Sequence, residues 1–136
     1  MRKILFDTNA YVAFKRGEET AINIVRLADK IGICSVVLGE LLAGFELGSR
    51  KAKNCLELKE FLSSPRVHVL TISGKTANFY ANIFCQLKQK GKPVPSNDMW
   101  IAASALENGF HVYTYDKHFG AIDGLLIGKE ESDFIL

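Results

Sequence analysis

Long apolar runs are absent from this sequence of 136 residues. No segment reaches the roughly 18 consecutive apolar residues of a membrane span. The acid Asp7 also interrupts the first apolar stretch before it attains the length of the hydrophobic region of a signal peptide. The pattern argues against a transmembrane segment and a secretion signal, and we expect a soluble cytoplasmic protein.

Cysteine is scarce as well, with only Cys34, Cys55 and Cys85 in the chain. Their number is odd, they lie far apart, and none belongs to a CxxC pair. This pattern favours neither a disulfide framework nor a zinc site. We expect the three residues to be reduced and packed in the core.

Acidic residues are missing from one long segment, between Phe61 and Asn97. That segment carries five basic residues: Arg66, Lys75, Lys88, Lys90 and Lys92. The net charge of the whole chain is only +2, which is small for a general nucleic-acid binder. Each basic residue alone is best explained as solvated helix surface. Together they predict a positive side of the molecule.

The apolar residues that are present, 48% of the chain, alternate between strand-like runs and segments of helical period. We expect strands at "KILF", "IGICS", "RVHVLTI", "FHVYTY" and, as a fifth candidate, "LLI". We expect helices at about 18–30, 35–48, 51–62, 73–91 and 98–107, the last ended by Gly109. This alternation predicts a single α/β domain over residues 1–136, with a mostly parallel sheet of four to five strands.

Four acids fall at related positions on this map. Asp7 and Asp116 follow strands directly, at the carboxyl edge where open α/β sheets bind ligands. Asp98 lies in the first turn of a predicted helix, and Glu40 lies near the start of another. Taken singly, each acid has a structural explanation as a helix-terminal, turn or surface charge. Four separate explanations are harder to accept than one shared site.

Carboxylates gathered at one edge repel one another and need compensation. A divalent cation supplies it, and an all-oxygen ligand set favours Mg²⁺ or Mn²⁺. The dipole of the helix that begins near Asp98 favours the ionised carboxylate there by about 0.3 to 1 kcal/mol. We therefore expect Asp98 to be charged.

The segments "ILFDTNAYVAFKRG", "GELLAG", "PSNDMWIAASALENG" and "VYTYDKHF" resemble the motifs of PIN-domain ribonucleases, especially the VapC toxins of VapBC toxin–antitoxin modules. The resemblance covers nearly the whole chain and implies a three-layer α/β/α fold. It implies an acidic, metal-binding and catalytic site made of Asp7, Glu40, Asp98 and Asp116, supported by Thr8, Asn9, Asn97 and Thr114. Gly39, which precedes Glu40, departs from the larger or hydroxylated residue frequent in the family, and it is expected to loosen the helix there.

The activity implied by the resemblance is metal-dependent cleavage of a structured RNA, tRNA or rRNA. A water activated by Mg²⁺ or Mn²⁺ would attack the phosphodiester and leave 5′-phosphate ends. The resemblance also implies a VapB-like antitoxin and a homodimer. Two alternatives remain: a PIN-like module that binds RNA or protein without cutting, and a small-molecule phosphohydrolase. "FDTNA" lacks the second aspartate of a DxDxT motif, which weighs against the latter.

Several further residues carry expectations of their own. His68 and His111 lie in predicted strands and are expected in the core, as is Trp100, whereas His118 is a weaker candidate for a substrate contact. The candidates for RNA phosphate contacts are Lys88, Lys90 and Lys92, followed by Arg50, Lys51 and Lys53.

Overall fold

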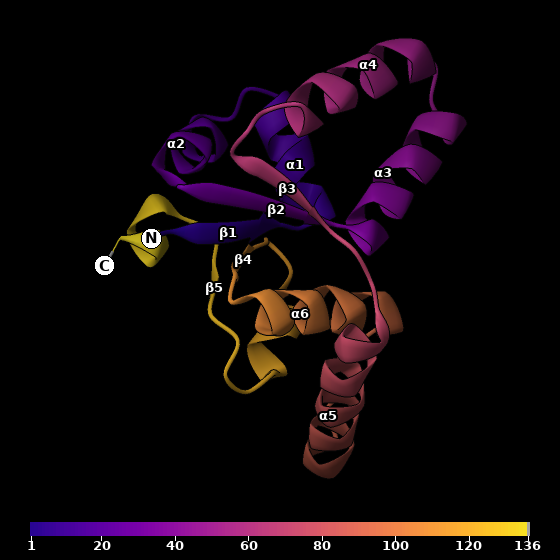
Figure 1. Cartoon of the computed structure of the whole chain (residues 1–136), viewed down its shortest axis with the longest axis vertical. Coiled ribbons are helices and arrows are strands. Elements are labelled where there is room, and N and C mark those ends of the chain that lie inside the picture. Colours follow the sequence, from indigo (N-terminus) through magenta and orange to yellow (C-terminus); the bar gives the residue numbers. More distant parts are fainter. Residues whose placement is uncertain (136) are drawn as a thin grey trace.

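The computed structural model describes residues 1–135, which form a central sheet with helices on both faces (Figure 1). The strands are β1 (Lys3–Phe6), β2 (Lys30–Cys34), β3 (Val67–Leu70), β4 (His111–Tyr113) and β5 (Ile127–Gly128). Their order across the sheet is β3-β2-β1-β4-β5, and every neighbouring pair is parallel. The predicted α/β fold is confirmed, with a sheet that is parallel throughout these five strands.

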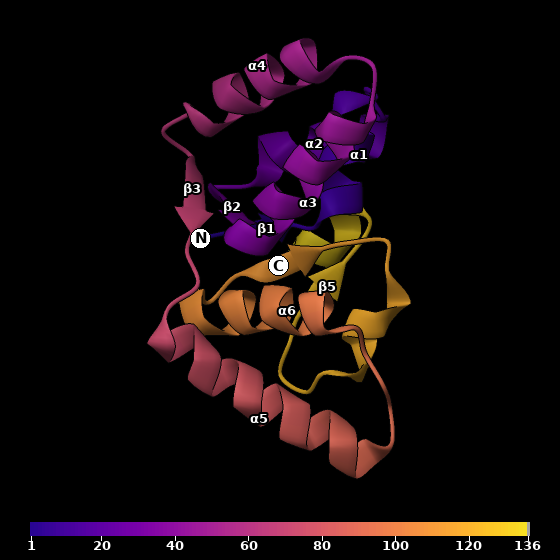
Figure 2. The same cartoon turned by 90° about the vertical axis from the view of Figure 1, so that its right-hand side faces the viewer.

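The helices make two layers, as the turned view shows (Figures 1 and 2). They are α1 (Thr8–Lys15), α2 (Glu19–Leu27), α3 (Ser35–Leu47), α4 (Lys51–Leu62), α5 (Gly74–Lys90) and α6 (Ser96–Asn108), with short 3₁₀ helices η1 (Lys117–Ala121) and η2 (Glu131–Phe134). The chain steps from β1 to β2 to β3 in one direction, so right-handed crossovers put α1 to α4 on one face. The connection from β3 back to β4 puts α5 and α6 on the other. The three-layer arrangement is therefore confirmed.

Some elements differ from the prediction. The sequence pattern did not indicate α1, which begins directly after β1 because the Asp7 side chain accepts a hydrogen bond from the Thr8 amide and caps the helix. Helix α6 begins at Ser96, two residues before Asp98. Pro95 is compatible with this start because it occupies the N-cap, where no backbone donor is required. The two 3₁₀ helices were also not predicted.

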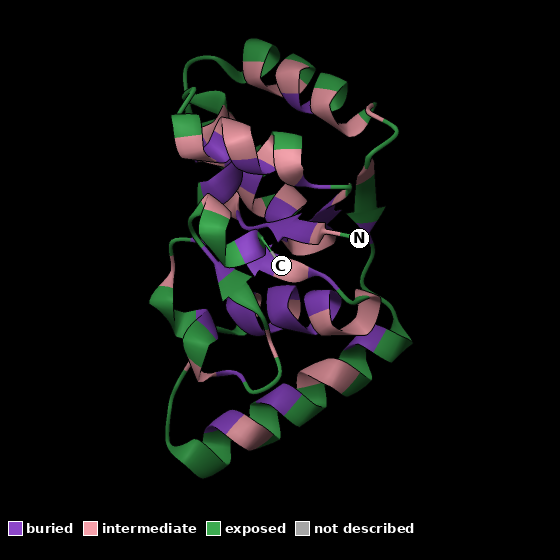
Figure 3. Cartoon of the chain, turned by 90° about the vertical axis from the view of Figure 1, so that its left-hand side faces the viewer, coloured by how far each residue is buried: buried purple, intermediate pink, exposed green. Residues whose placement is uncertain are grey.

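The core lies between the layers, and Figure 3 shows that the buried residues concentrate in the strands and in α6. Ala102, Ala103 and Ala105 are completely buried, and such small side chains let α6 approach the sheet closely. On the opposite face, Tyr11 packs edge-on against Phe61, with ring centroids 5.2 Å apart. The close approach of α6 matters for the site because it brings the first turn of this helix to the sheet edge.

Several predicted core positions turn out differently. His68 is exposed because β3 is an edge strand with only Leu70 fully buried, so the core prediction for it is wrong. Of the cysteines only Cys34 is buried, and Cys85 is exposed. His111 is half-buried. Within residues 1–135, no helix is both long and apolar enough to cross a membrane.

Trp100 was expected in the core but lies at its margin. Its side chain is half-buried and stacks on Tyr80, with the ring centroids 4.1 Å apart, so it joins α6 to α5.

Candidate functional site

At the carboxyl ends of the neighbouring strands β1 and β4, the chain leaves the sheet toward opposite faces. Helix α1 leaves β1 on one face of the sheet, and η1, which follows β4, contacts α6 on the other. Such a switch point opens a crevice at the sheet edge. A cleft of about 660 Å³ lies here, and it is lined by all four predicted acids: Asp7, Glu40, Asp98 and Asp116. The sequence prediction that they share one rim is confirmed.

Asp7 is held rigidly at the floor of the cleft and is only 5% exposed. Its Oδ1 accepts from the Thr8 amide at 2.8 Å and its Oδ2 from the Thr114 hydroxyl at 2.7 Å. The Thr114 oxygen in turn accepts from the Asp116 amide at 2.9 Å, which ties the two acidic segments together. Burial raises the pKa of Asp7 above its ordinary value, and the charges of Glu40 and Asp116 add to this effect.

Glu40 reaches the cleft from α3, and both of its carboxylate oxygens are bound. The Thr8 hydroxyl donates to Oε1 at 2.6 Å, and the Asn97 amide donates to Oε2 at 2.7 Å. Thr8 and Asn97 were expected beside Asp7 and Asp98, but through their side chains they position Glu40. Helix α3 runs without a break through Gly39, so the expected loosening there does not occur.

Asp98 sits in the first turn of α6 and is 6% exposed. Burial raises its pKa to about 6, while the hydrogen bond from His118 lowers it and the charges of Asp116 and Asp7 raise it. The helix dipole therefore does not lower the pKa of Asp98, although a pKa of about 6 still leaves the carboxylate mostly ionised at neutral pH. The loss of hydration and the neighbouring carboxylates outweigh a dipole contribution of about 0.3 to 1 kcal/mol.

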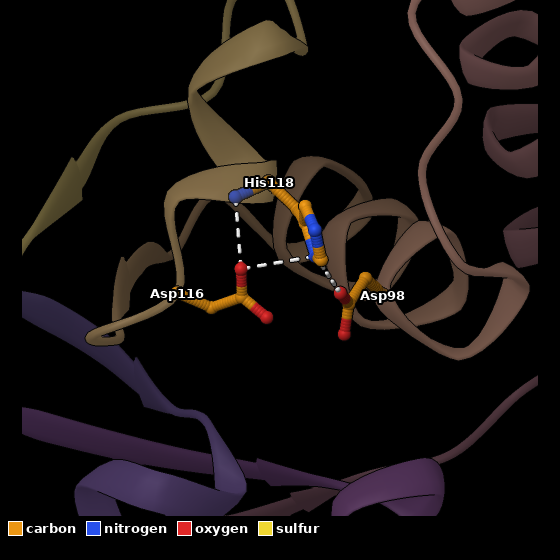
Figure 4. Close-up of side chains that lie close together, drawn as sticks. All are labelled: Asp98, Asp116 and His118. Carbon is orange, nitrogen blue, oxygen red and sulfur yellow. Dashed lines mark hydrogen bonds and ion pairs between the residues drawn. The ribbon is translucent and has the colours of Figure 1, made fainter.

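His118 lies between two of the acids, as Figure 4 shows. Its Nδ1 is 3.2 Å from Asp98 Oδ2 and 3.0 Å from Asp116 Oδ1. Its backbone amide also donates to Asp116 Oδ1 at 2.9 Å. Sequence reasoning gave His118 too little weight, although its position two residues after Asp116 was a usable signal. Asp116 caps the turn that begins η1, and this turn brings the imidazole ring of His118 over the Asp116 carboxylate.

Asn9 has a peripheral role in this arrangement. It is exposed, and its side-chain oxygen accepts from the Tyr115 amide at 3.2 Å. The contact links the start of α1 to the segment after β4, and it supports the cleft wall without reaching the carboxylates.

The residues of the cleft fit a divalent cation. Asp98, Asp116 and His118 each offer a ligand atom, and these atoms lie within 4.8 Å of one another. Among residues 1–135, no Lys or Arg side chain forms an ion pair with any of the four acids. Asp7 and Asp98 are nearly buried carboxylates with raised pKa values and no Lys or Arg paired to them, and a bound cation would relieve their repulsion. Asp7 lies outside the three-residue group.

The predicted basic residues are not all available to RNA. Lys90 binds the Ala121 carbonyl and pairs with Asp123, and Lys51 pairs with Glu46. Lys88 lines a mostly apolar hollow that does not include any residue of the acidic cleft. The remaining predicted cations are Lys92, Arg50 and Lys53, and each lines a hollow next to the cleft.

The sequence matches the PIN domain over residues 4–125, the span that contains all four acids. The chain belongs to the PIN-domain family. The family resemblance drawn from the motifs is thereby confirmed. Among curated PIN relatives, the chain is 33% identical over 128 residues to ribonuclease VapC2 of Rickettsia felis, a match that covers 90% of this chain and 94% of the relative.

Solved structures of similar PIN proteins agree with this assignment. The crystal structure of DNA-bound VapBC from Salmonella typhimurium contains a chain 30% identical to this one, with a TM-score of 0.83 and coverage of 94% of this chain and 98% of that one. VapBC2 from Rickettsia felis, bound to a DNA fragment from its promoter, gives a TM-score of 0.83 at 28% identity, with coverage of 93% and 97%.

Proposed function

We propose that this PIN-domain protein is a metal-dependent endoribonuclease and the toxin of a type II toxin–antitoxin pair. The observation that carries the proposal is the convergence of Asp7, Glu40, Asp98 and Asp116 on one cleft at the sheet edge. The named relative is a VapC ribonuclease, and the similar solved structures are VapBC complexes. A VapB-like antitoxin is therefore the expected partner, and a homodimer the expected assembly.

Asp98, Asp116 and His118 would hold the cation, and Asp7 lines the same cleft. When bound, the cation supplies an activated water and neutralises charge on the scissile phosphate. An imidazole nitrogen in the ligand set favours Mn²⁺ over Mg²⁺ more than an all-oxygen set would. With water as the nucleophile no 2′,3′-cyclic phosphate forms, and departure of the ribose 3′-oxygen would leave 5′-phosphate and 3′-hydroxyl ends.

The protein's own groups prepare the site for this reaction. Thr114 and the Thr8 amide fix the orientation of the Asp7 carboxylate, so no reorganisation is required when substrate arrives. Glu40, held by Thr8 and Asn97, is placed to orient or deprotonate a water at the cleft. We infer that the substrate is a structured RNA of the cytosol, tRNA or rRNA.

The test replaces Asp7 or Asp116 with Asn, which keeps side-chain size but removes an anionic ligand. Each variant should fold, bind RNA, fail to arrest growth when expressed without antitoxin, and release no 5′-phosphate fragments with Mg²⁺ or Mn²⁺. Glu60→Gln is the matched control because Glu60 is an exposed acid outside the cleft, and it should cut like the parent.

Parent-level cleavage by both Asn variants would contradict the assignment of these acids. If the parent binds RNA but never cuts it in either metal, the alternative of a PIN-like binding module without cleavage activity replaces this proposal.

A further inference from the structure

A basic groove lies beside the acidic cleft, between α1 and α4. This α1–α4 groove has a volume of about 290 Å³ and is lined by the cations Lys15, Arg16, Arg50 and Lys53, with Glu57 as its one carboxylate. It shares Arg16 and Val12 with the acidic cleft, so the two hollows adjoin each other. A chain-like ligand that occupies the groove would therefore be led to the acids.

A second basic hollow adjoins the cleft on the side of η1. This η1 hollow, of about 420 Å³, lies where the loop after α5 meets η1, and its cations are Lys92 and Lys117. It shares His118 with the acidic cleft. The acidic site is thus bordered by positive charge both on the α1 side and on the η1 side.

All but one of the cations that line the two hollows have no carboxylate partner among the described residues. Within residues 1–135, none of Arg16, Arg50, Lys53, Lys92 and Lys117 forms an ion pair with a carboxylate. Lys15 is different, because it lies 3.6 Å from Glu57. An unpaired cation beside a hollow can contact a phosphate without first giving up a carboxylate partner.

The α1–α4 groove also contains polar groups without partners. Tyr11 lines it and is only 2% exposed, yet its hydroxyl has no hydrogen-bond partner among the described residues. Buried hydroxyls normally have one, so Tyr11 is an exception within the wall of this groove. Asn54, half-buried in the same wall, supplies a further amide side chain.

We propose that the α1–α4 groove and the η1 hollow bind the RNA backbone on the two sides of the phosphodiester that is cut. The strand then runs along Arg50, Lys53 and Arg16, across the acids, and out past Lys92 and Lys117. This inference rests on the proposed ribonuclease function. In this proposal the cations of the two hollows contact the RNA phosphates, in place of the sequence-predicted Lys88 and Lys90.

Electrostatics explains why contacts on both sides are needed. The cleft is lined by five carboxylates, those of the four predicted acids and Glu18, and they repel a phosphate. Attraction must therefore come from the borders of the cleft and from a bound cation. Phosphate contacts set the register of a nucleic acid, and two separated sets hold the scissile bond over the acids more firmly than one.

The experiment measures binding of a short fluorescein-labelled oligouridylate over a series of salt concentrations, with Mg²⁺ held constant. All variants carry Asp116→Asn so that the RNA stays intact. One double variant is Arg50→Gln with Lys53→Gln, and the other is Lys92→Gln with Lys117→Gln. Arg16 and His118 are left unchanged because they line the cleft itself.

Each phosphate contact contributes about −0.7 to the slope of log affinity against log salt for a single strand. Each double variant should therefore flatten the slope by about 1.4 units, and their combination by about 2.8. The control, Lys59→Gln with Lys75→Gln, makes the same charge change at exposed positions outside both hollows and should keep the Asp116→Asn slope.

An unchanged slope in either double variant, or equal flattening in the control, would overturn the two-sided path. If the double variants keep RNA binding but lose a co-expressed antitoxin, the hollows bind that protein, and the proposal is wrong. The assay is independent of cleavage. If the parent cuts RNA but the double variants keep the parent salt slope, only the proposed RNA path is wrong. If the double variants flatten the slope but the parent never cuts RNA, the path stands and the ribonuclease proposal is wrong.

Discussion

Asp98→Asn should stabilise the metal-free protein at neutral pH, although it removes a residue of the proposed active site. Burial raises the pKa of Asp98 to about 6, about two units above its ordinary value of 3.8. The folded state therefore holds a proton that the unfolded chain releases, and stability falls as pH rises from about 4 to about 6. The side chain is 8% exposed, so solvent screens little of this effect.

The magnitude follows from the shift, because one pKa unit corresponds to about 1.4 kcal/mol. The amide of the Asp98→Asn variant stays neutral at every pH but gives up the charge-assisted contact with His118. We expect a net gain of about 2 kcal/mol in the free energy of unfolding at pH 7.5, shrinking below about 1 kcal/mol at pH 4. For a domain of this size, that gain raises the melting temperature by roughly 7 °C.

The assay is thermal and urea unfolding in EDTA at both pH values, with Glu60→Gln as the exposed control. The control should stay within about 0.5 kcal/mol of the parent at each pH. The reasoning that the buried Asp98 carboxylate destabilises the metal-free protein would be refuted in either of two cases. One is that Asp98→Asn does not increase the free energy of unfolding at pH 7.5; the other is that it increases it equally at pH 4.

Three further predictions concern the cation, the floor of the cleft and the packing of the sheet. Millimolar Mn²⁺ should raise the melting temperature of the parent, and Asp98→Asn should reduce that rise. In calorimetric titrations, His118→Gln should lower the affinity for Mn²⁺ more than the affinity for Mg²⁺. Thr114→Val should lose about 1 to 3 kcal/mol in urea unfolding because it leaves a buried carboxylate oxygen without its donor, whereas Thr114→Ser should retain most of the stability. Gly32→Ala should destabilise by about 1 to 3 kcal/mol, since its Cβ would lie 2.9 Å from a phenylalanine ring, and Gly39→Ala, with nothing within 4 Å, should stabilise α3 by up to about 1 kcal/mol.

Local pattern was sufficient for much of the fold. Strand-like runs separated by capped helices predicted the parallel sheet, and Ser73 and Gly91 marked the two ends of α5 correctly. The acids at strand ends and first turns were also visible, because in a parallel sheet those positions all meet at one edge. Helix α1 escaped prediction because its eight residues are fewer than the roughly 11 to 18 residues over which a helical period is read.

The sequence by itself determined that Asp7, Glu40, Asp98 and Asp116 reach the cleft, since topology carries each strand end and helix start to the same edge. Only the tertiary structure decided how those residues interact. The partners of Thr8 and Asn97, the position of His118 over two acids, and the raised pKa of Asp98 depend on contacts between segments far apart in the chain. The same holds for the cations. Lys90 is neutralised by Asp123, and Arg16 lines the cleft. Both depend on neighbours in space that no local sequence pattern reveals.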